Sequence, residues 1–214
     1  MKYKLIIFDW DGTLMDSIPK IVHCLKLSAL QVGLPEPTTN EAAAVIGLSL
    51  DVAIAALFPE QENYWTELVT GYQANYKASD SIQPVMFDGT AKLLSDLRDQ
   101  GLLLAVATGK SRQGLNRVLD ESQLCDYFIT SRTADEAHSK PAPDMLKQIL
   151  NEVGIDASSA LMVGDSLLDM TMASNANMDA VAMSWGAADK LSLSASKALT
   201  ICDSYVQLRQ VICS

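Results

Sequence analysis

The chain has 214 residues, of which 49% are hydrophobic, a proportion typical of a packed globular protein. Its formal net charge of −10 argues against nucleic acid or an anionic membrane surface as a partner. We find no segment apolar enough to span a bilayer, and Asp9 and Asp11 interrupt the first apolar run too early for a signal peptide. We therefore expect a cytoplasmic protein, built as one large domain or as a core with an insert.

The cysteines and histidines form no pattern typical of a metal site. Cys24, Cys125, Cys202 and Cys213 are scattered, with no Cys-x-x-Cys pair, and His23 and His138 are far apart. We interpret the cysteines as small buried hydrophobic residues, and expect neither a zinc site nor a disulfide framework.

The first expected strand covers residues 5–8 and runs directly into Asp9-Trp10-Asp11-Gly12-Thr13. Ligands of open α/β sheets bind beyond the carboxyl ends of the strands, so both acids stand where chemistry is expected. Gly12 allows the backbone to turn sharply. Either the two acids hold a divalent metal, or Asp9 is also a nucleophile and Asp11 transfers a proton. Taken alone, Asp-x-Asp-Gly is more typical of a turn with solvated acids.

The next stretch has helical periodicity. Apolar spacing predicts a helix over about 17–32, with Asp16 and Ser17 as candidate caps. Helical patterns resume over 40–45, 50–57 and 60–77, and we expect no strand between 16 and 86. Residues 16–86 are therefore predicted to form a helical insert, the cap, with 1–15 and 87–214 as the core. We expect the cap's own core to contain Tyr64, Trp65, Tyr72 and Tyr76.

From residue 87 onward, strand and helix patterns alternate. Strands are expected at 102–107, 127–130, 160–163 and 180–183, with a further short strand or turn near 200–203. Helices are expected from a cap at Asp88 to 97, then at 111–119, 144–153 and 167–175, and at the C-terminus. Repeated strand–helix units predict an α/β fold with a doubly wound parallel sheet.

Polar groups follow several of these strands. Thr108 and Gly109 end one strand, Lys140 stands before Pro141, and Asp165 is followed four residues later by Asp169, on the same helix face. Each alone has an ordinary structural interpretation, and we expect Lys110 and Arg112 to be solvated, with contact to the substrate as the alternative. Together the groups converge on one sheet edge as an acid cluster suited to Mg²⁺, with a hydroxyl and an ammonium beside it. This combination predicts phosphoryl transfer.

Four motifs of this chain resemble those of the haloacid dehalogenase superfamily: Asp9-Trp10-Asp11-Gly12-Thr13, Thr108-Gly109, Lys140-Pro141, and Asp165 with Asp169. The helical insert resembles the cap of the phosphoglycolate phosphatase-like branch of that superfamily. The resemblance implies that Asp9 is the nucleophile forming an aspartyl-phosphate and Asp11 the general acid and base. It implies Mg²⁺ held by Asp9, the Asp11 backbone carbonyl and Asp165, supported by Asp169. It also implies that Thr108, Gly109 and Lys140 hold the phosphate. Gly47 is placed where related caps have a loop near the substrate.

The resemblance thus implies a Mg²⁺-dependent phosphatase acting on a small phosphorylated metabolite, phosphoglycolate-like or a sugar phosphate. An acid two residues after the nucleophile argues against dehalogenases, and Ile21 stands where hexose-phosphate mutases of this branch carry a histidine. A mutase, a pyrophosphatase and a non-catalytic phospho-ligand binding protein remain as alternatives. Receiver domains share such acids but are shorter and have no helical cap. We expect a monomer or a small homo-oligomer.

Overall fold

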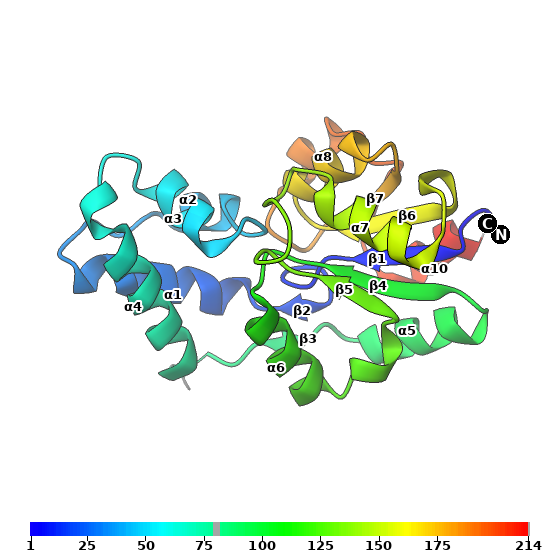
Figure 1. Cartoon of the computed structure of the whole chain (residues 1–214), viewed down its shortest axis with the longest axis horizontal. Coiled ribbons are helices and arrows are strands. Elements are labelled where there is room, and N and C mark those ends of the chain that lie inside the picture. Colours follow the sequence, from blue (N-terminus) through cyan, green and yellow to red (C-terminus); the bar gives the residue numbers. More distant parts are fainter. Residues whose placement is uncertain (79–81, 214) are drawn as a thin grey trace.

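A parallel sheet flanked by helices lies beside a separate group of helices, α1 to α4 (Figure 1). This computed structural model describes residues 1–78 and 82–213. Within these residues the main sheet has six strands in the order β5-β4-β1-β6-β7-β8, all paired in parallel. The strands are β1 (Leu5–Phe8), β4 (Leu103–Ala107), β5 (Thr130–Arg132), β6 (Ala160–Gly164), β7 (Asp179–Met183) and β8 (Thr200–Cys202). The predicted α/β fold is confirmed.

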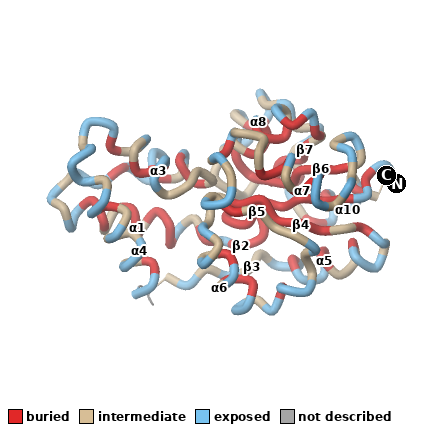
Figure 2. The backbone as a smooth tube through the Cα atoms, in the orientation of Figure 1, coloured by how far each residue is buried: buried red, intermediate tan, exposed pale blue. Residues whose placement is uncertain are grey.

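Strand β1 lies in the middle of the sheet and is buried on both faces, which explains its unbroken apolar sequence (Figure 2). Ile6 and Phe8 face a cluster that includes α5 (Thr90–Asp99), α6 (Arg112–Ser122) and α10 (Tyr205–Cys213). Leu5 and Ile7 face α7 (Asp144–Val153), α8 (Leu167–Asn175) and α9 (Lys190–Ser194). β4 pairs with one side of β1 and β6 with the other. From β1 the chain therefore adds β4 and β5 on one side and then β6, β7 and β8 on the other, so the order of the strands changes direction beside β1.

The remaining helices, which we continue to call the cap, have a hydrophobic core of their own. They are α1 (Ile18–Gln31), α2 (Thr39–Ala44), α3 (Leu50–Leu57) and α4 (Trp65–Ala78), with a 3₁₀ turn η1 (Glu62–Tyr64) before α4. Of the four aromatic residues expected inside, Tyr76 is buried and Trp65 and Tyr72 are partly buried, but Tyr64 is exposed.

The expectation that no strand lies between 16 and 86 is wrong at both ends of that range. Strands β2 (Met15–Asp16) and β3 (Val85–Met86) pair antiparallel where the chain enters and leaves the cap. Each of these strands is only two residues long, which is too short for the alternation of apolar and polar residues that predicts a strand. Their pairing holds the two connections between core and cap side by side.

Two other predictions about local structure are wrong. The strand expected at 127–130 begins at residue 130, because Tyr127 ends a 3₁₀ turn, η2 (Cys125–Tyr127), and packs with Phe128 against the core. Asp88 does not cap α5, because Gly89 stands at the N-cap with a φ of +85°, a left-handed conformation that glycine adopts at little cost.

The cysteines are all free thiols, as expected. Cys24 and Cys202 are buried, but Cys125 is exposed, contrary to the interpretation of all four as buried hydrophobic residues. Among the described helices, each is too short or too polar to cross a membrane.

Candidate active site

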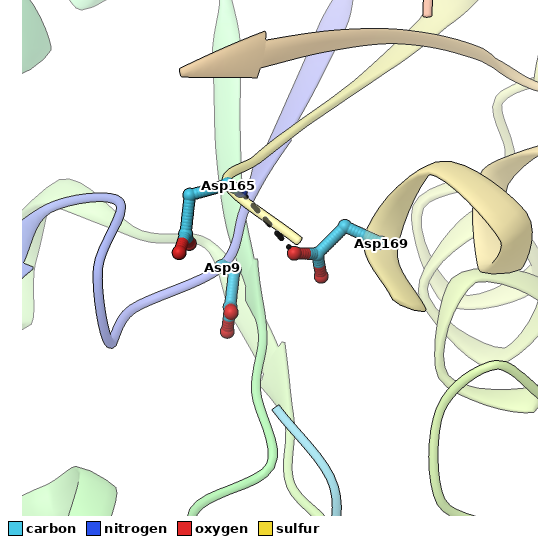
Figure 3. Close-up of side chains that lie close together, drawn as sticks. All are labelled: Asp9, Asp165 and Asp169. Atoms are coloured by element: carbon cyan, nitrogen blue, oxygen red, sulfur yellow. Dashed lines mark hydrogen bonds between the residues drawn. The ribbon is translucent and has the colours of Figure 1, made fainter. Parts of the chain in front are cut away.

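Three of the predicted acids meet at the carboxyl ends of adjacent strands. Asp9 follows β1, Asp165 follows its neighbour β6, and Asp169 lies in the first turn of α8 (Figure 3). Each offers a carboxylate oxygen, and the three oxygens lie within 4.8 Å of one another. The parallel register places the two strand ends side by side, and the helical turn brings the third acid back to them.

Lys140 supplies the positive charge inside this cluster. Its Nζ lies 2.7 Å from Asp169 Oδ1 and 2.9 Å from Asp9 Oδ1, and the residue is 1% exposed. The lysine comes from the loop before α7, and its peptide bond to Pro141 is cis. A buried ammonium group needs such partners, because burial removes the water that would otherwise solvate its charge.

Asp169 is held in place by the start of its own helix. Ser166, the N-cap of α8, donates from its hydroxyl to Asp169 Oδ2 over 2.6 Å, and the Asp169 backbone N–H donates back to Ser166 Oγ. The backbone N–H of Asp165 also donates to Asp169 Oδ2. With Oδ2 engaged in this way and Oδ1 facing Lys140, Asp169 is an anchor for the lysine.

Asp165 is fixed by two donors and crowded by two glycines. Thr13 Oγ1 donates to Oδ1 over 2.6 Å, and the backbone N–H of Ala187 donates to Oδ2 over 2.7 Å. A Cβ at Gly12 would lie 2.3 Å from Oδ2, and one at Gly186 would lie 2.0 Å from it. Neither contact is tolerable, so both positions need glycine for the carboxylate to sit where it does.

The environment opposes ionisation of these carboxyl groups when no cation is bound. Burial raises the pKa of Asp9 from 3.8 to about 7, against the opposing effect of Lys140. Burial, and then the Asp169 carboxylate, raise the pKa of Asp165 well above its usual value. Burial alone would lower the pKa of Lys140, but Asp169 and Asp9 raise it, so the lysine stays charged.

The residues fit a hard divalent cation. Three buried carboxylates lie together, and the one ammonium in the cluster contacts only two of them, Asp9 and Asp169, so negative charge exceeds positive charge. Uncompensated negative charge in a buried place is costly unless a further cation binds there. Oxygen donors without histidine or cysteine match the preferences of Mg²⁺.

Asp11 lies beside the cluster and has a different partner. Its Oδ1 is 2.8 Å from Lys110 Nζ and accepts a hydrogen bond from Ser17. The expectation of a solvated Lys110 is therefore wrong, because its side chain is only 9% exposed in this ion pair. Ser17 does stand at the N-cap of α1, but it makes no capping bond, since its hydroxyl is turned to Asp11.

The cap reaches the end of β4 through residues 45–50. A Cβ at Gly109 would lie 2.5 Å from the carbonyl oxygen of Gly47 and 2.6 Å from that of Leu48. Thr108, just before Gly109, is fully buried. Ser49 donates its backbone N–H to Ser139 Oγ over 2.8 Å. The loop containing Gly47 thus lies against Thr108-Gly109 on one side and near Ser166 on the other.

Other singled-out residues lie apart from the acids. Arg112 pairs with Glu136 and donates to Ser131, which ties α6 to β5 and to the loop after it. His138 is exposed and bonds Asp144. Trp10, between the two catalytic candidates, is buried against Phe128 in an edge-to-face contact.

A cavity of about 970 Å³ opens from Asp11 toward the cap. Its lining comes from both parts of the chain, including Lys20, Gly47 and Tyr76 of the cap and Gly109, Lys110 and Arg117 of the core. A small organic molecule therefore has room on the cap side of Asp11.

The "Haloacid dehalogenase-like hydrolase" family profile matches residues 6–183. The chain belongs to this family. A protein named "Probable phosphatase IndB" from Dickeya dadantii is 32% identical over 209 residues, covering 95% of this chain and 91% of that protein. A phosphoglycolate phosphatase from Aliivibrio fischeri is 29% identical, covering 98% and 96%. The expected family is confirmed, and the relatives' names agree with the expected class of enzyme.

A solved structure also matches along the whole chain. The crystal structure titled as a predicted phosphatase from Clostridium acetobutylicum superposes with a TM-score of 0.89 at 25% identity, covering all of this chain and 99% of that one. Core and cap are therefore both part of the shared architecture.

The roles of three residues of the site were not predicted from the sequence. Lys110 and Ser17 contact Asp11, and Gly186 makes room for Asp165. The lysine two residues after Thr108 carried a usable signal, since it follows a strand end that faces the site. Gly186 and Ser17 carried none, because their roles depend on contacts between distant segments.

Proposed function

We propose that this haloacid dehalogenase-like chain is a Mg²⁺-dependent phosphatase that hydrolyses a small phosphorylated metabolite, phosphoglycolate-like or a sugar phosphate. The observation that carries the proposal is the buried cluster of Asp9, Asp165 and Asp169, three carboxylates beside a single ammonium, Lys140. The names of the two relatives support phosphate esters as substrates.

In the proposed first step, an Asp9 carboxylate oxygen attacks phosphorus and the bond from phosphorus to the ester oxygen breaks. The departing alcohol takes a proton from Asp11, which is why Asp11 must lie on the leaving-group side, where the cavity opens. The product of this step is an aspartyl-phosphate at Asp9.

In the second step, water attacks the aspartyl-phosphate and gives a proton to Asp11. The bond from phosphorus to Asp9 breaks, and inorganic phosphate and the Asp9 carboxylate are restored. Lys140 and Thr108, with the backbone of Gly109, would hold the phosphoryl oxygens throughout, while Asp169 keeps Lys140 in position.

Asp9, Asp165 and the Asp11 backbone carbonyl would hold Mg²⁺, with Asp169 in support. When bound, the ion screens the repulsion between Asp9 and the phosphate and offsets charge that develops on the phosphoryl oxygens. The cap, taken as residues 16–86, would exclude bulk water from the aspartyl-phosphate.

The test is phosphate release from a panel of phosphorylated metabolites, with Mg²⁺ and with a chelator. We expect metal-dependent release, and a phosphorylated Asp9 peptide in quenched reactions analysed by mass spectrometry. Asp9→Asn should abolish turnover, whereas Asp126→Asn, at an exposed position away from the site, should not. Full activity of the folded Asp9→Asn protein, or no release across the panel from folded wild-type protein, would overturn the proposal.

A further inference from the structure

Tyr205, the first residue of α10, reaches the loop that follows β1. Its hydroxyl donates to the carbonyl oxygen of Thr13 over 2.8 Å, although 192 positions separate the two residues in the chain. Tyr205 is 9% exposed and lies in the hydrophobic cluster on the face of the sheet that α5 and α10 cover. The last helix of the chain thus holds the backbone of the segment that carries Asp9 and Asp11.

Thr13, which Tyr205 holds, is itself a donor to Asp165. Its Oγ1 donates to Asp165 Oδ1 over 2.6 Å. The place of a threonine hydroxyl depends on the place of its backbone, and the carbonyl of Thr13 is fixed by the hydrogen bond from Tyr205. The hydroxyl of Tyr205 therefore supports the first of the two donors that hold the Asp165 carboxylate.

The second donor to Asp165 is supported by the ring of the same tyrosine. Ala187, whose backbone N–H donates to Asp165 Oδ2 over 2.7 Å, lies two residues after Trp185 in the loop that follows β7. The Trp185 and Tyr205 rings meet edge-to-face, with their centroids 5.1 Å apart. Aromatic pairs in this arrangement attract each other. One tyrosine thus contacts both segments that donate to Asp165.

Tyr205 is fixed in turn by the segments that connect core and cap. Thr90, the first residue of α5, has its Oγ1 2.9 Å from Tyr205 Oη and 3.2 Å from the carbonyl oxygen of Leu14. The backbone N–H of Phe87 donates to the same carbonyl, and the Phe87 ring lies 5.2 Å from that of Trp185. The tyrosine therefore stands between the connections to the cap and the residues that hold Asp165.

Tyr205 keeps its donor hydrogen at neutral pH. Burial raises the pKa of its hydroxyl well above the usual value of 10.0. A backbone carbonyl can only accept a hydrogen bond, so the contact with Thr13 needs the protonated hydroxyl. The bond is therefore present throughout the pH range in which metal binding is measured.

We infer that Tyr205 is a positioning residue for the metal site, because it holds Thr13 and Trp185 and, through their segments, the proposed Mg²⁺ ligand Asp165. The inference rests on the proposed Mg²⁺-dependent function and adds to it a residue that lies outside the four motifs. Mg²⁺ requires nearly ideal octahedral geometry, whereas Ca²⁺ accepts longer and more variable distances. An Asp165 that has lost part of its support should therefore bind Mg²⁺ less tightly and Ca²⁺ almost as before.

Tyr205→Phe tests the inference, because it keeps the ring beside Trp185 and removes only the hydroxyl. Calorimetry on the substrate-free protein should give a Kd for Mg²⁺ about tenfold higher than that of the wild type, and a Kd for Ca²⁺ changed by less than about twofold. The change in the ratio of the two Kd values distinguishes a positioning role from a general loss of stability.

Tyr3→Phe is the matched control. Tyr3 is a buried tyrosine of the same hydrophobic cluster, and its hydroxyl donates to Asp179 over 2.9 Å. Its loss should lower the melting temperature about as much as Tyr205→Phe does, since each variant loses one hydrogen bond, but should leave both Kd values unchanged. Equal Mg²⁺ Kd values in Tyr205→Phe and Tyr3→Phe, or a loss of Ca²⁺ affinity as large as that of Mg²⁺, would overturn the inference.

The route through Thr13 has its own test. Thr13→Val removes the donor to Asp165 at nearly constant side-chain shape and should by itself raise the Kd for Mg²⁺. Adding Tyr205→Phe to Thr13→Val should raise it by less than about a further threefold, because both changes act on the same donor. Full multiplication of the two effects would overturn the route. Thr90→Val, which removes the hydroxyl facing Tyr205 and leaves α10 unchanged, should raise the Kd for Mg²⁺ in the same direction.

Metal binding separates this inference from the proposed function. If Tyr205→Phe weakens Mg²⁺ binding as expected but the wild-type protein releases phosphate from no ester, the inference stands and the phosphatase proposal fails. Metal-dependent phosphate release, together with equal Mg²⁺ Kd values in Tyr205→Phe and Tyr3→Phe, has the opposite meaning. A folded wild-type protein that binds no Mg²⁺ would overturn both.

Discussion

Lys110 Nζ and Asp11 Oδ1 lie 2.8 Å apart, in an ion pair whose two side chains are each about nine-tenths buried. The pair joins the end of β4 to the loop after β1. It places the fixed positive charge of Lys110 next to Asp11, the residue proposed to give and take protons. Burial would lower the pKa of Lys110, but Asp11, followed by Tyr76, outweighs it and raises the pKa, so the lysine is charged at neutral pH.

Replacing this lysine tests the pair. Lys110→Met keeps the length of the side chain but leaves the Asp11 carboxylate without its cation in a buried place. We expect kcat to fall by about tenfold or more, because Asp11 loses the contact that fixes its side chain and the cation that balances its charge. Lys92→Met, at an exposed lysine that pairs with Asp96, is the control. Unchanged kcat in Lys110→Met would show that the pair has no part in turnover.

Gly109→Ala should separate the cap loop from the core. The new Cβ would lie 2.5 Å from the Gly47 carbonyl oxygen, and backbone atoms must move to relieve that contact. Because Gly109 does not have a positive φ, the substitution adds bulk without backbone strain. We expect about a tenfold loss in kcat/KM at nearly unchanged melting temperature. Gly114→Ala on α6, where the nearest atom is Ser111 Oγ at 3.3 Å, is the matched control, and equal kinetics in the two variants would refute the role of Gly109.

Gly186→Ala should weaken metal binding. Its Cβ would lie 2.0 Å from Asp165 Oδ2 and so displace a proposed metal ligand, although residue 186 is 21 positions away in the chain. We expect the Mg²⁺ concentration for half-maximal activity to rise by about tenfold or more. Titration of activity with Mg²⁺ measures this, beside the same Gly114→Ala control. A Mg²⁺ requirement equal to that of the wild type would contradict the proposed site.

The affinity for Mg²⁺ should depend on pH. Burial raises the pKa of Asp9 to about 7, so below that pH the metal-free carboxyl group is protonated and the ion must displace the proton. The Kd should therefore increase by about tenfold or more for each pH unit below about 7, because the raised pKa of Asp165 adds a second proton that the ion must displace. Calorimetry in two buffers of different ionisation enthalpy would also count the protons released. A Kd independent of pH in this range would mean that Asp9 is already ionised.

The sequence alone was enough to determine the framework of this protein. Buried strands such as Leu5–Phe8 and helices such as Asp144–Val153 and Leu167–Asn175 lie at the predicted positions, because their apolar periodicity is set by which faces are buried. Asp9, Asp165 and Asp169 could be grouped in advance because the ends of parallel strands meet at one sheet edge.

Only the tertiary structure determined the partners of those residues. Lys110 had the sequence context of a solvated lysine, and Ser17 that of a helix cap, yet both contact Asp11. Tyr76 had the spacing of a residue inside the cap, but its ring also lies near Lys20, Lys110 and Arg117, which come from three different elements. Apolar periodicity shows which side of a helix or strand is buried. Which side chain contacts that side depends on how elements distant in the sequence pack together.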